Sequence, residues 1–148
     1  MRKISKKEED TKELAKHLFS KIKNKKSKKA TVVGLYGDLG TGKTTFTKFF
    51  GKIVGIKNKI NSPTFVIMKR YGLKDSRFKN LFHIDAYRIK DENELNNLFW
   101  KEIKNNPENL IFIEWPEMIK RNIPKKHHKV YIKHTKRGER EFKLVPYK

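Results

Sequence analysis

The residues with the clearest chemical signature are Gly37, Gly42, Lys43 and Thr44, which fit the spacing G-x-x-x-x-G-K-[ST]. A polyphosphate carries several negative charges, and a glycine-rich turn can meet them with successive backbone N–H groups. The N-terminus of a following helix points further amides and its dipole at the same group. Lys43 would then contact the β- and γ-phosphates, and the Thr44 hydroxyl would hold Mg²⁺. This segment therefore predicts a site for a magnesium-bound nucleotide.

The sequence on either side of this loop predicts the strand and the helix that must hold it. Residues 31–36 are β-rich and mostly apolar, as a buried strand requires. The residues after Thr44 carry apolar side chains at helical spacing, namely Phe46, Phe49, Phe50 and Ile53, and Gly55 follows as a stop signal. The alternative is a glycine-rich turn that merely joins a strand to a helix, and the full match with these flanks disfavours it.

Two later segments add carboxylates to this site. Residues 110–114 are apolar up to Glu114, which is typical of a Walker B strand that delivers an acid beside the phosphate loop to position Mg²⁺. Residues 81–88 alternate as a strand should, with His83, Asp85 and Tyr87 on one face. We expect Asp85 to orient a metal-bound or attacking water. The alternative for this face is the solvent-facing side of an edge strand.

For several other polar residues, the spacing alone allows both a functional and a purely structural interpretation. Ser62-Pro63-Thr64 is either a stiffened loop near the phosphates or an ordinary turn before a strand. Thr11, near the start of an N-terminal helix, either lies near a bound base or is solvated. Arg140 either reaches the nucleotide or is solvated beside its turn. We interpret His127-His128, in a basic loop, as surface residues.

The remaining pattern predicts the fold class. An apolar stripe indicates a helix near the N-terminus, and residues 91–104 are predicted as a further helix whose inward side chains are Leu95, Leu98, Phe99 and Ile103. Residues 130–134 and 141–145 read as an antiparallel hairpin. We expect a single three-layer α/β domain over residues 1–148, with an N-terminal helix and a basic linker in residues 1–29. It would be a P-loop NTPase fold, with a mixed, largely parallel sheet and antiparallel C-terminal strands.

The amino-acid composition limits the class of protein and the kinds of partner that we expect. The chain has no cysteine, which excludes disulfides and thiolate metal sites, and no apolar run approaches the length of a membrane span. A cytoplasmic protein is the expectation. The net charge is +21, with 30 Lys and 7 Arg. This charge fits an acidic partner such as RNA, and it equally fits the codon bias of an AT-rich genome.

The ordered motifs resemble those of the TsaE family, the bacterial P-loop ATPases needed for threonylcarbamoyladenosine synthesis on tRNA. They read in sequence as Gly37 to Thr45, Ser62 to Phe65, His83 to Arg88, Glu92 to Glu94, and Glu114-Trp115. The resemblance covers about residues 11–140. The late Gly-Arg of the family reads here as Gly138-Glu139-Arg140, with one residue inserted.

The resemblance implies roles for individual residues. ATP would be bound by Thr11, Gly37, Asp38, Leu39, Gly40, Thr41, Gly42, Lys43, Thr44, Thr45, Trp115 and Arg140. Lys43, Asp85 and Glu114 would act in catalysis, with Asp85 as the family's essential acid. Thr44 and Glu114 would coordinate Mg²⁺, and Ser62, Pro63 and Thr64 would form a switch-like loop. The partners would be TsaB and TsaD, whose complex is reset by ATP hydrolysis, and tRNA would be contacted indirectly or weakly.

Three other functions share parts of this pattern. A small-molecule kinase has the same loop but usually an arginine-bearing lid, which the sequence does not show. A GTPase would need Asn-Lys-x-Asp, and Asn58-Lys59-Ile60-Asn61 lacks the acid. A non-catalytic RNA-binding module with a nucleotide-sensing site would explain the basic charge.

Overall fold

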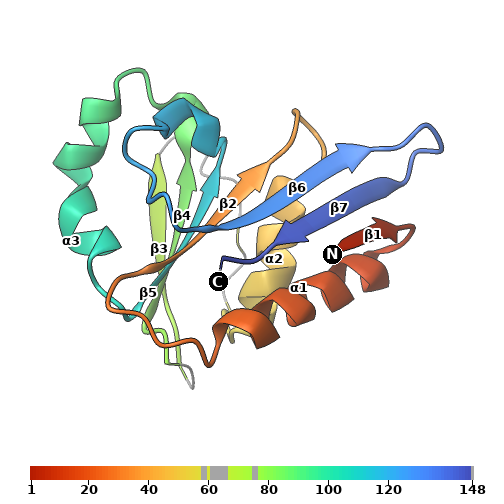
Figure 1. The fold of residues 1–148 in the computed structure, drawn as a ribbon, viewed down its shortest axis with the longest axis horizontal. Coiled ribbons are helices and arrows are strands. Elements are labelled where there is room, and N and C mark those ends of the chain that lie inside the picture. The colour runs from red at the N-terminus through yellow and green to blue at the C-terminus, as the bar shows by residue number, and fades with distance from the viewer. Residues whose placement is uncertain (58–59, 61–66, 75–76, 148) are drawn as a thin grey trace.

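The helices and strands of the chain are built around one mixed sheet, as a computed structural model shows (Figure 1). The structure describes residues 1–57, 60, 67–74 and 77–147. Within these ranges seven strands pair in the order β1-β7-β6-β2-β5-β4-β3. The strands are β1 Arg2–Ser5, β2 Thr31–Tyr36, β3 Met68–Gly72, β4 Asn80–Asp85, β5 Asn109–Glu114, β6 His128–His134 and β7 Arg140–Val145.

The centre of the sheet is parallel and its edges are antiparallel. Strand β2 lies between β5 and β6 and runs parallel to both, and β4 runs parallel to β5. Strands β3, β7 and β1 add antiparallel edges. The predicted α/β fold, with a mixed sheet and antiparallel C-terminal strands, is therefore confirmed.

Helices cover the two faces of the sheet and make it the middle of three layers (Figure 1). Helices α1 Glu8–Ile22 and α2 Lys43–Ile53 pack on one face, and α3 Trp100–Lys104 lies against the other. The short 3₁₀ segments are η1 Ala86–Arg88, η2 Glu92–Leu98 and η3 Pro116–Ile119. No helix in the described ranges is long and apolar enough to cross a bilayer.

Strand β5 shows why the central strands are apolar throughout. Its alternating side chains enter two different cores, with Phe112 packed toward α1 and α2 and Ile111 packed toward α3. All six residues of β5 are buried, including Glu114 at its end. A strand that is covered on both faces does not alternate between polar and apolar residues, so its continuous apolar run could be recognised in the sequence.

Three expectations about local structure were wrong. Strand β4 ends at Asp85 and the chain turns into η1, so Tyr87 leaves the strand face and is 60% exposed. The helix expected over residues 91–104 is interrupted at Phe99, which has a left-handed backbone (φ 59°) and is 70% exposed. Its inward place is taken by Trp100, whose indole N–H donates to a backbone carbonyl.

The prediction that the two histidines of the basic loop before β6 lie at the surface was also wrong. His127 and His128 are both buried rather than at the surface. His127 bonds the Tyr36 hydroxyl and the Pro124 carbonyl, and His128 accepts from the backbone N–H of Tyr147. Burial lowers the pKa of His128 to about 4 and also lowers that of His127, so both rings are neutral near pH 7.

Candidate functional site

The glycine-rich loop joins β2 to α2 at the carboxyl end of the parallel strands. Two of its glycines are required by geometry. A Cβ on Gly37 would lie 2.5 Å from the Ile132 carbonyl oxygen of β6, and Gly42 has φ 108°. The Thr41 hydroxyl closes the turn by donating to the Asp38 carbonyl, at 2.9 Å. Leu39 is 84% exposed at the tip, so it contributes backbone rather than packing.

Lys43 begins helix α2, and its side chain folds back over the loop. Its Nζ donates to the Gly37 carbonyl and, at 3.0 Å, to the Asp38 carbonyl. The same ammonium lies 4.0 Å from the centre of the Trp115 ring. Burial lowers the pKa of Lys43, and nearby carboxylates, Glu114 first among them, oppose that shift. The cation is thus held within the concave side of the loop.

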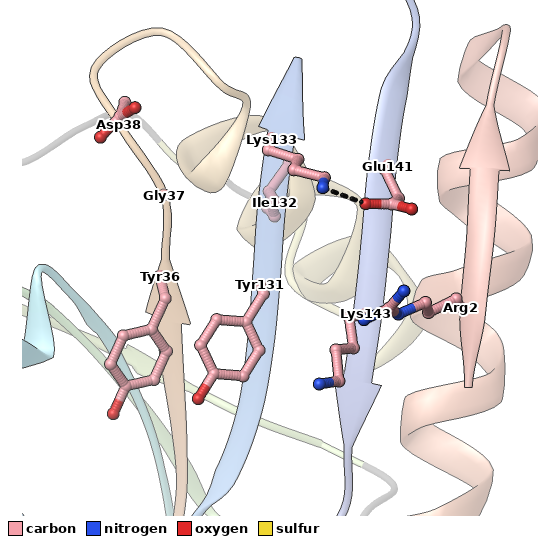
Figure 2. Close-up of a pocket in the computed structure, with 9 residues that line it drawn as sticks. All are labelled: Arg2, Tyr36, Gly37, Asp38, Tyr131, Ile132, Lys133, Glu141 and Lys143. Atoms are coloured by element: carbon pink, nitrogen blue, oxygen red, sulfur yellow. Dashed lines mark ion pairs between the residues drawn. The ribbon is translucent and has the colours of Figure 1, made fainter. Parts of the chain in front are cut away.

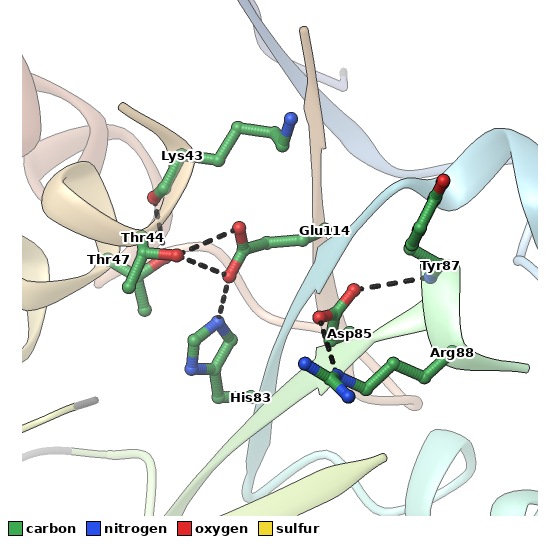
Figure 3. Close-up of polar contacts among 8 residues, drawn as sticks. All are labelled: Lys43, Thr44, Thr47, His83, Asp85, Tyr87, Arg88 and Glu114. Carbon is green, nitrogen blue, oxygen red and sulfur yellow. Dashed lines mark hydrogen bonds and ion pairs between the residues drawn. The ribbon is translucent and has the colours of Figure 1, made fainter. Parts of the chain in front are cut away.

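Thr44, Glu114 and His83 form one polar chain, in which Glu114 and His83 are buried (Figure 3). The Thr44 hydroxyl lies 3.0 Å from each carboxylate oxygen of Glu114. The His83 Nε2 donates to Glu114 Oε2 across 2.6 Å, and the His83 ring is fully buried. His83 Nδ1 has no hydrogen-bond partner among the described residues. Three different elements, α2, β5 and β4, therefore fix the position of one carboxylate.

Asp85 ends β4 directly beside Glu114, because the two residues are register partners on parallel strands. Its carboxylate accepts from the Tyr87 backbone N–H at 3.2 Å and pairs with Arg88 at 3.4 Å (Figure 3). Burial raises the pKa of Asp85, and repulsion from Glu114 adds to the rise. The two acids therefore lie side by side at one end of the sheet, and Glu114 disfavours the charged form of Asp85.

A pocket of about 420 Å³ lies on the α1 side of the loop. It is lined by Thr11, Thr45 and Arg140 among others, which brings together three residues from the two ends and the middle of the chain. The Arg140 guanidinium also packs over Gly42, where an added Cβ would meet its Nη1 at 3.0 Å. The inserted residue before Arg140 has not moved this side chain away from the loop.

Sequence reasoning missed two histidines at the site. His83 was placed on the correct strand face, but its bond to Glu114 depends on how β4 and β5 align. His134, at the end of β6, donates from Nε2 to the Gly40 carbonyl at 3.0 Å. No short sequence pattern predicts either of these two hydrogen bonds. Ser62, Pro63 and Thr64 lie outside the described residues.

The donor set beside the loop fits Mg²⁺. A hydroxyl and a carboxylate are hard oxygen ligands, and Mg²⁺ in phosphate sites is commonly bound by one or two protein oxygens plus phosphates and waters. No group of three or more His, Cys, Asp or Glu side chains suited to a metal is found in the part of the chain that the structure describes. The site therefore fits a magnesium ion that shares its ligands with a phosphate better than a closed protein cage.

The fold and the loop define a P-loop α/β protein. The crystal structure of Bacillus subtilis YdiB superposes with a TM-score of 0.72 at 30% identity, covering 100% of this chain and 86% of that one. A sequence model described as threonylcarbamoyl adenosine biosynthesis protein TsaE matches residues 5–142. The chain therefore belongs to the TsaE family.

Named relatives agree with this assignment. The tRNA threonylcarbamoyladenosine biosynthesis protein TsaE of Bacillus subtilis is 37% identical over 118 residues, which are 78% of this chain and 69% of that protein. The protein of the same name from Rickettsia felis is 42% identical over 114 residues, or 76% of this chain. The match spans only 61% of the length of the Rickettsia felis protein.

Proposed function

We propose that this chain is a magnesium-dependent ATPase of the cytoplasm that supports threonylcarbamoyladenosine modification of tRNA. The observation that carries the proposal is the position of Thr44, the residue directly after the loop lysine Lys43. Its hydroxyl lies 3.0 Å from both carboxylate oxygens of Glu114. Ligands of open α/β sheets bind at the carboxyl ends of the strands, where this pair lies. The tRNA pathway comes from the names of the relatives.

Each part of ATP has a chemical counterpart at the site. The loop from Gly37 to Thr45 presents backbone amides to the phosphates, and Lys43 neutralises charge on the β- and γ-phosphates. Thr44 and Glu114 would hold Mg²⁺, which offsets negative charge on the phosphates when it is bound. The pocket lined by Thr11, Thr45 and Arg140 is the proposed place of the base. Asp38, Leu39, Gly40, Thr41, Gly42 and Trp115 complete the proposed binding set.

Asp85 is the proposed positioning group for the attacking water. Its carboxylate lies beside Glu114, and its raised pKa makes it a better proton acceptor than an ordinary aspartate. Arg88 and the Tyr87 N–H fix its orientation. Catalysis here is positioning plus charge neutralisation, so the isolated protein is expected to be slow. Ser62, Pro63 and Thr64 stay a predicted switch-like loop.

The test is ATP hydrolysis by the purified chain, alone and with the TsaB–TsaD pair that the family resemblance implies. We expect slow turnover alone and faster turnover with the pair. Lys43→Ala and Asp85→Ala should each lower the rate by at least about a hundredfold. Lys48→Ala, on the same helix but outside the site, is the matched control. Hydrolysis by Asp85→Ala at the parent rate would remove Asp85 from the mechanism. Transfer of phosphate to nucleosides instead of water would favour a kinase.

A further inference from the structure

A second concave surface lies at the opposite end of β2 from the phosphate loop. It is a cavity of about 710 Å³ between the α1–β2 connection and the loop before β6. Thr31, the first residue of β2, lines it, whereas the phosphate loop follows Tyr36, the last residue. At about 3.3 Å per residue, the strand separates the two sites by roughly 20 Å.

Lysines dominate this cavity, which we call the lysine cavity. Six lysines line it, and none of its described lining residues is an Asp or a Glu; the lysines are Lys25, Lys26, Lys28, Lys29, Lys125 and Lys126. No ion pair involves any of them within the described ranges. The open sheet face beside the phosphate loop is different, because there Lys133 pairs with Glu141 at 2.8 Å (Figure 2). Among the described residues, therefore, no acidic side chain neutralises the positive charge of the lysine cavity.

One lysine of the cavity, Lys25, is held in place by Tyr147. Lys25 lies 3.9 Å from the centre of the Tyr147 ring and donates to the Tyr147 carbonyl. The Tyr147 N–H in turn donates to His128 Nδ1 at 3.0 Å, which ties this segment to the start of β6. Codon bias would explain many lysines, but it does not explain why six gather around one cavity whose described lining includes no Asp or Glu.

We propose that the lysine cavity binds the phosphate backbone of RNA. Lysine ammonium groups are mobile point charges that suit phosphates and displace their counterions. Tyr147 places an aromatic ring among them, on which an unpaired base can stack. The choice of RNA over an acidic protein rests on the proposed function, because the pathway of the relatives acts on tRNA. A tRNA bound here would leave the nucleotide site open.

The test measures binding of labelled tRNA by fluorescence anisotropy over a series of salt concentrations. The variant carries Lys26→Gln, Lys28→Gln, Lys29→Gln and Lys125→Gln, four exposed residues of the lysine cavity. The matched control loses the same charge at four exposed lysines elsewhere, with Lys52→Gln, Lys101→Gln, Lys120→Gln and Lys136→Gln. Thermal unfolding checks both proteins. If the fourfold variant does not fold, Lys28→Glu is compared with Lys101→Glu.

The expected result is a loss of at least about tenfold in tRNA affinity for the cavity variant, with a salt slope smaller by about 3. The control should stay within about threefold of the parent. Equal losses in both variants, or no loss in either, would overturn the proposal. So would a cavity variant that keeps tRNA affinity but no longer associates with the TsaB–TsaD pair, because that result assigns the cavity to a protein partner.

The same proteins separate this proposal from the proposed function. ATP hydrolysis should be retained by the cavity variant, and tRNA affinity should be retained by Lys43→Ala. A parent chain without ATPase activity would remove the proposed function, but a cavity-specific loss of tRNA affinity would still support RNA binding. An active ATPase whose tRNA affinity does not depend on the cavity lysines would support the proposed function and remove the proposal that the lysine cavity binds RNA.

Discussion

Replacing His83 by phenylalanine tests how the site holds Glu114, the proposed metal ligand. The His83 ring is fully buried, and its Nε2 donates to Glu114 Oε2 across 2.6 Å. Phenylalanine fills a similar volume but offers no donor. The Glu114 carboxylate, itself 6% exposed, would then keep only the Thr44 hydroxyl as a described side-chain donor. We expect the orientation of this carboxylate to loosen, so Mg²⁺ should bind more weakly.

The size of this effect can be estimated in two ways. A hydrogen bond to a charged group contributes about 1.5–3 kcal/mol, which is roughly a 10- to 150-fold change in an equilibrium constant. Loss of a residue that orients a metal ligand typically weakens metal binding by about 10- to 100-fold. Both routes predict that the Mg²⁺ concentration for half-maximal ATP binding rises by about one to two orders of magnitude.

The assay is a Mg²⁺ titration of ATP binding for the parent, His83→Phe and His127→Phe. His127 is the matched control because it is also buried and hydrogen-bonded, to the Tyr36 hydroxyl at 2.8 Å, but it does not contact an acid. His127→Phe should lose stability and keep the parent Mg²⁺ requirement. An unchanged Mg²⁺ requirement in His83→Phe, with the fold intact, would refute the idea that His83 orients Glu114.

Three further predictions concern stability. The pKa of His128 is about 4 in the folded chain and 6.5 in the unfolded chain, so the unfolded chain binds more protons between these two pH values. The free energy of unfolding, measured by urea denaturation, should therefore fall by about 2 kcal/mol from pH 7 to pH 5, and His128→Asn should reduce this loss. Gly37→Ala places a Cβ 2.5 Å from the Ile132 carbonyl oxygen and should lower the free energy of unfolding by about 1–3 kcal/mol and weaken ATP binding, whereas parent-like values for both would show that the loop can move. Phe99→Gly should raise the midpoint of thermal unfolding, because it relieves about 1 kcal/mol of left-handed strain at a residue that is 70% exposed; a lower midpoint would contradict this.

The features that the sequence predicted well are those encoded within a short stretch. The loop from Gly37 to Thr44 depends on local spacing, and the buried strand that ends at Glu114 shows as an uninterrupted apolar run. The fold class follows because a parallel sheet covered on both faces leaves that pattern in its strands. The proximity of Glu114 to Thr44 was expected from the same rule and is seen at 3.0 Å.

The features that escaped prediction depend on contacts between distant segments. The bond from His83 to Glu114 joins residues 31 positions apart and needs the register of β4 against β5. His127 and His128 look solvated beside their lysines, yet tertiary contacts bury them. The helix expected through Phe99 has the right periodicity, and the break there places the larger Trp100 in the core instead.

The outer strands of the sheet have a consequence for how copies of this protein meet. Among the strands that the structure describes, β1 and β3 form the two edges of the sheet, and edge strands present unpaired main-chain groups that can recruit another sheet. Both are short, and each carries two consecutive cations, Arg2-Lys3 on β1 and Lys69-Arg70 on β3. Edge-to-edge approach of two molecules would bring these like charges together, and their repulsion opposes pairing of the two sheets.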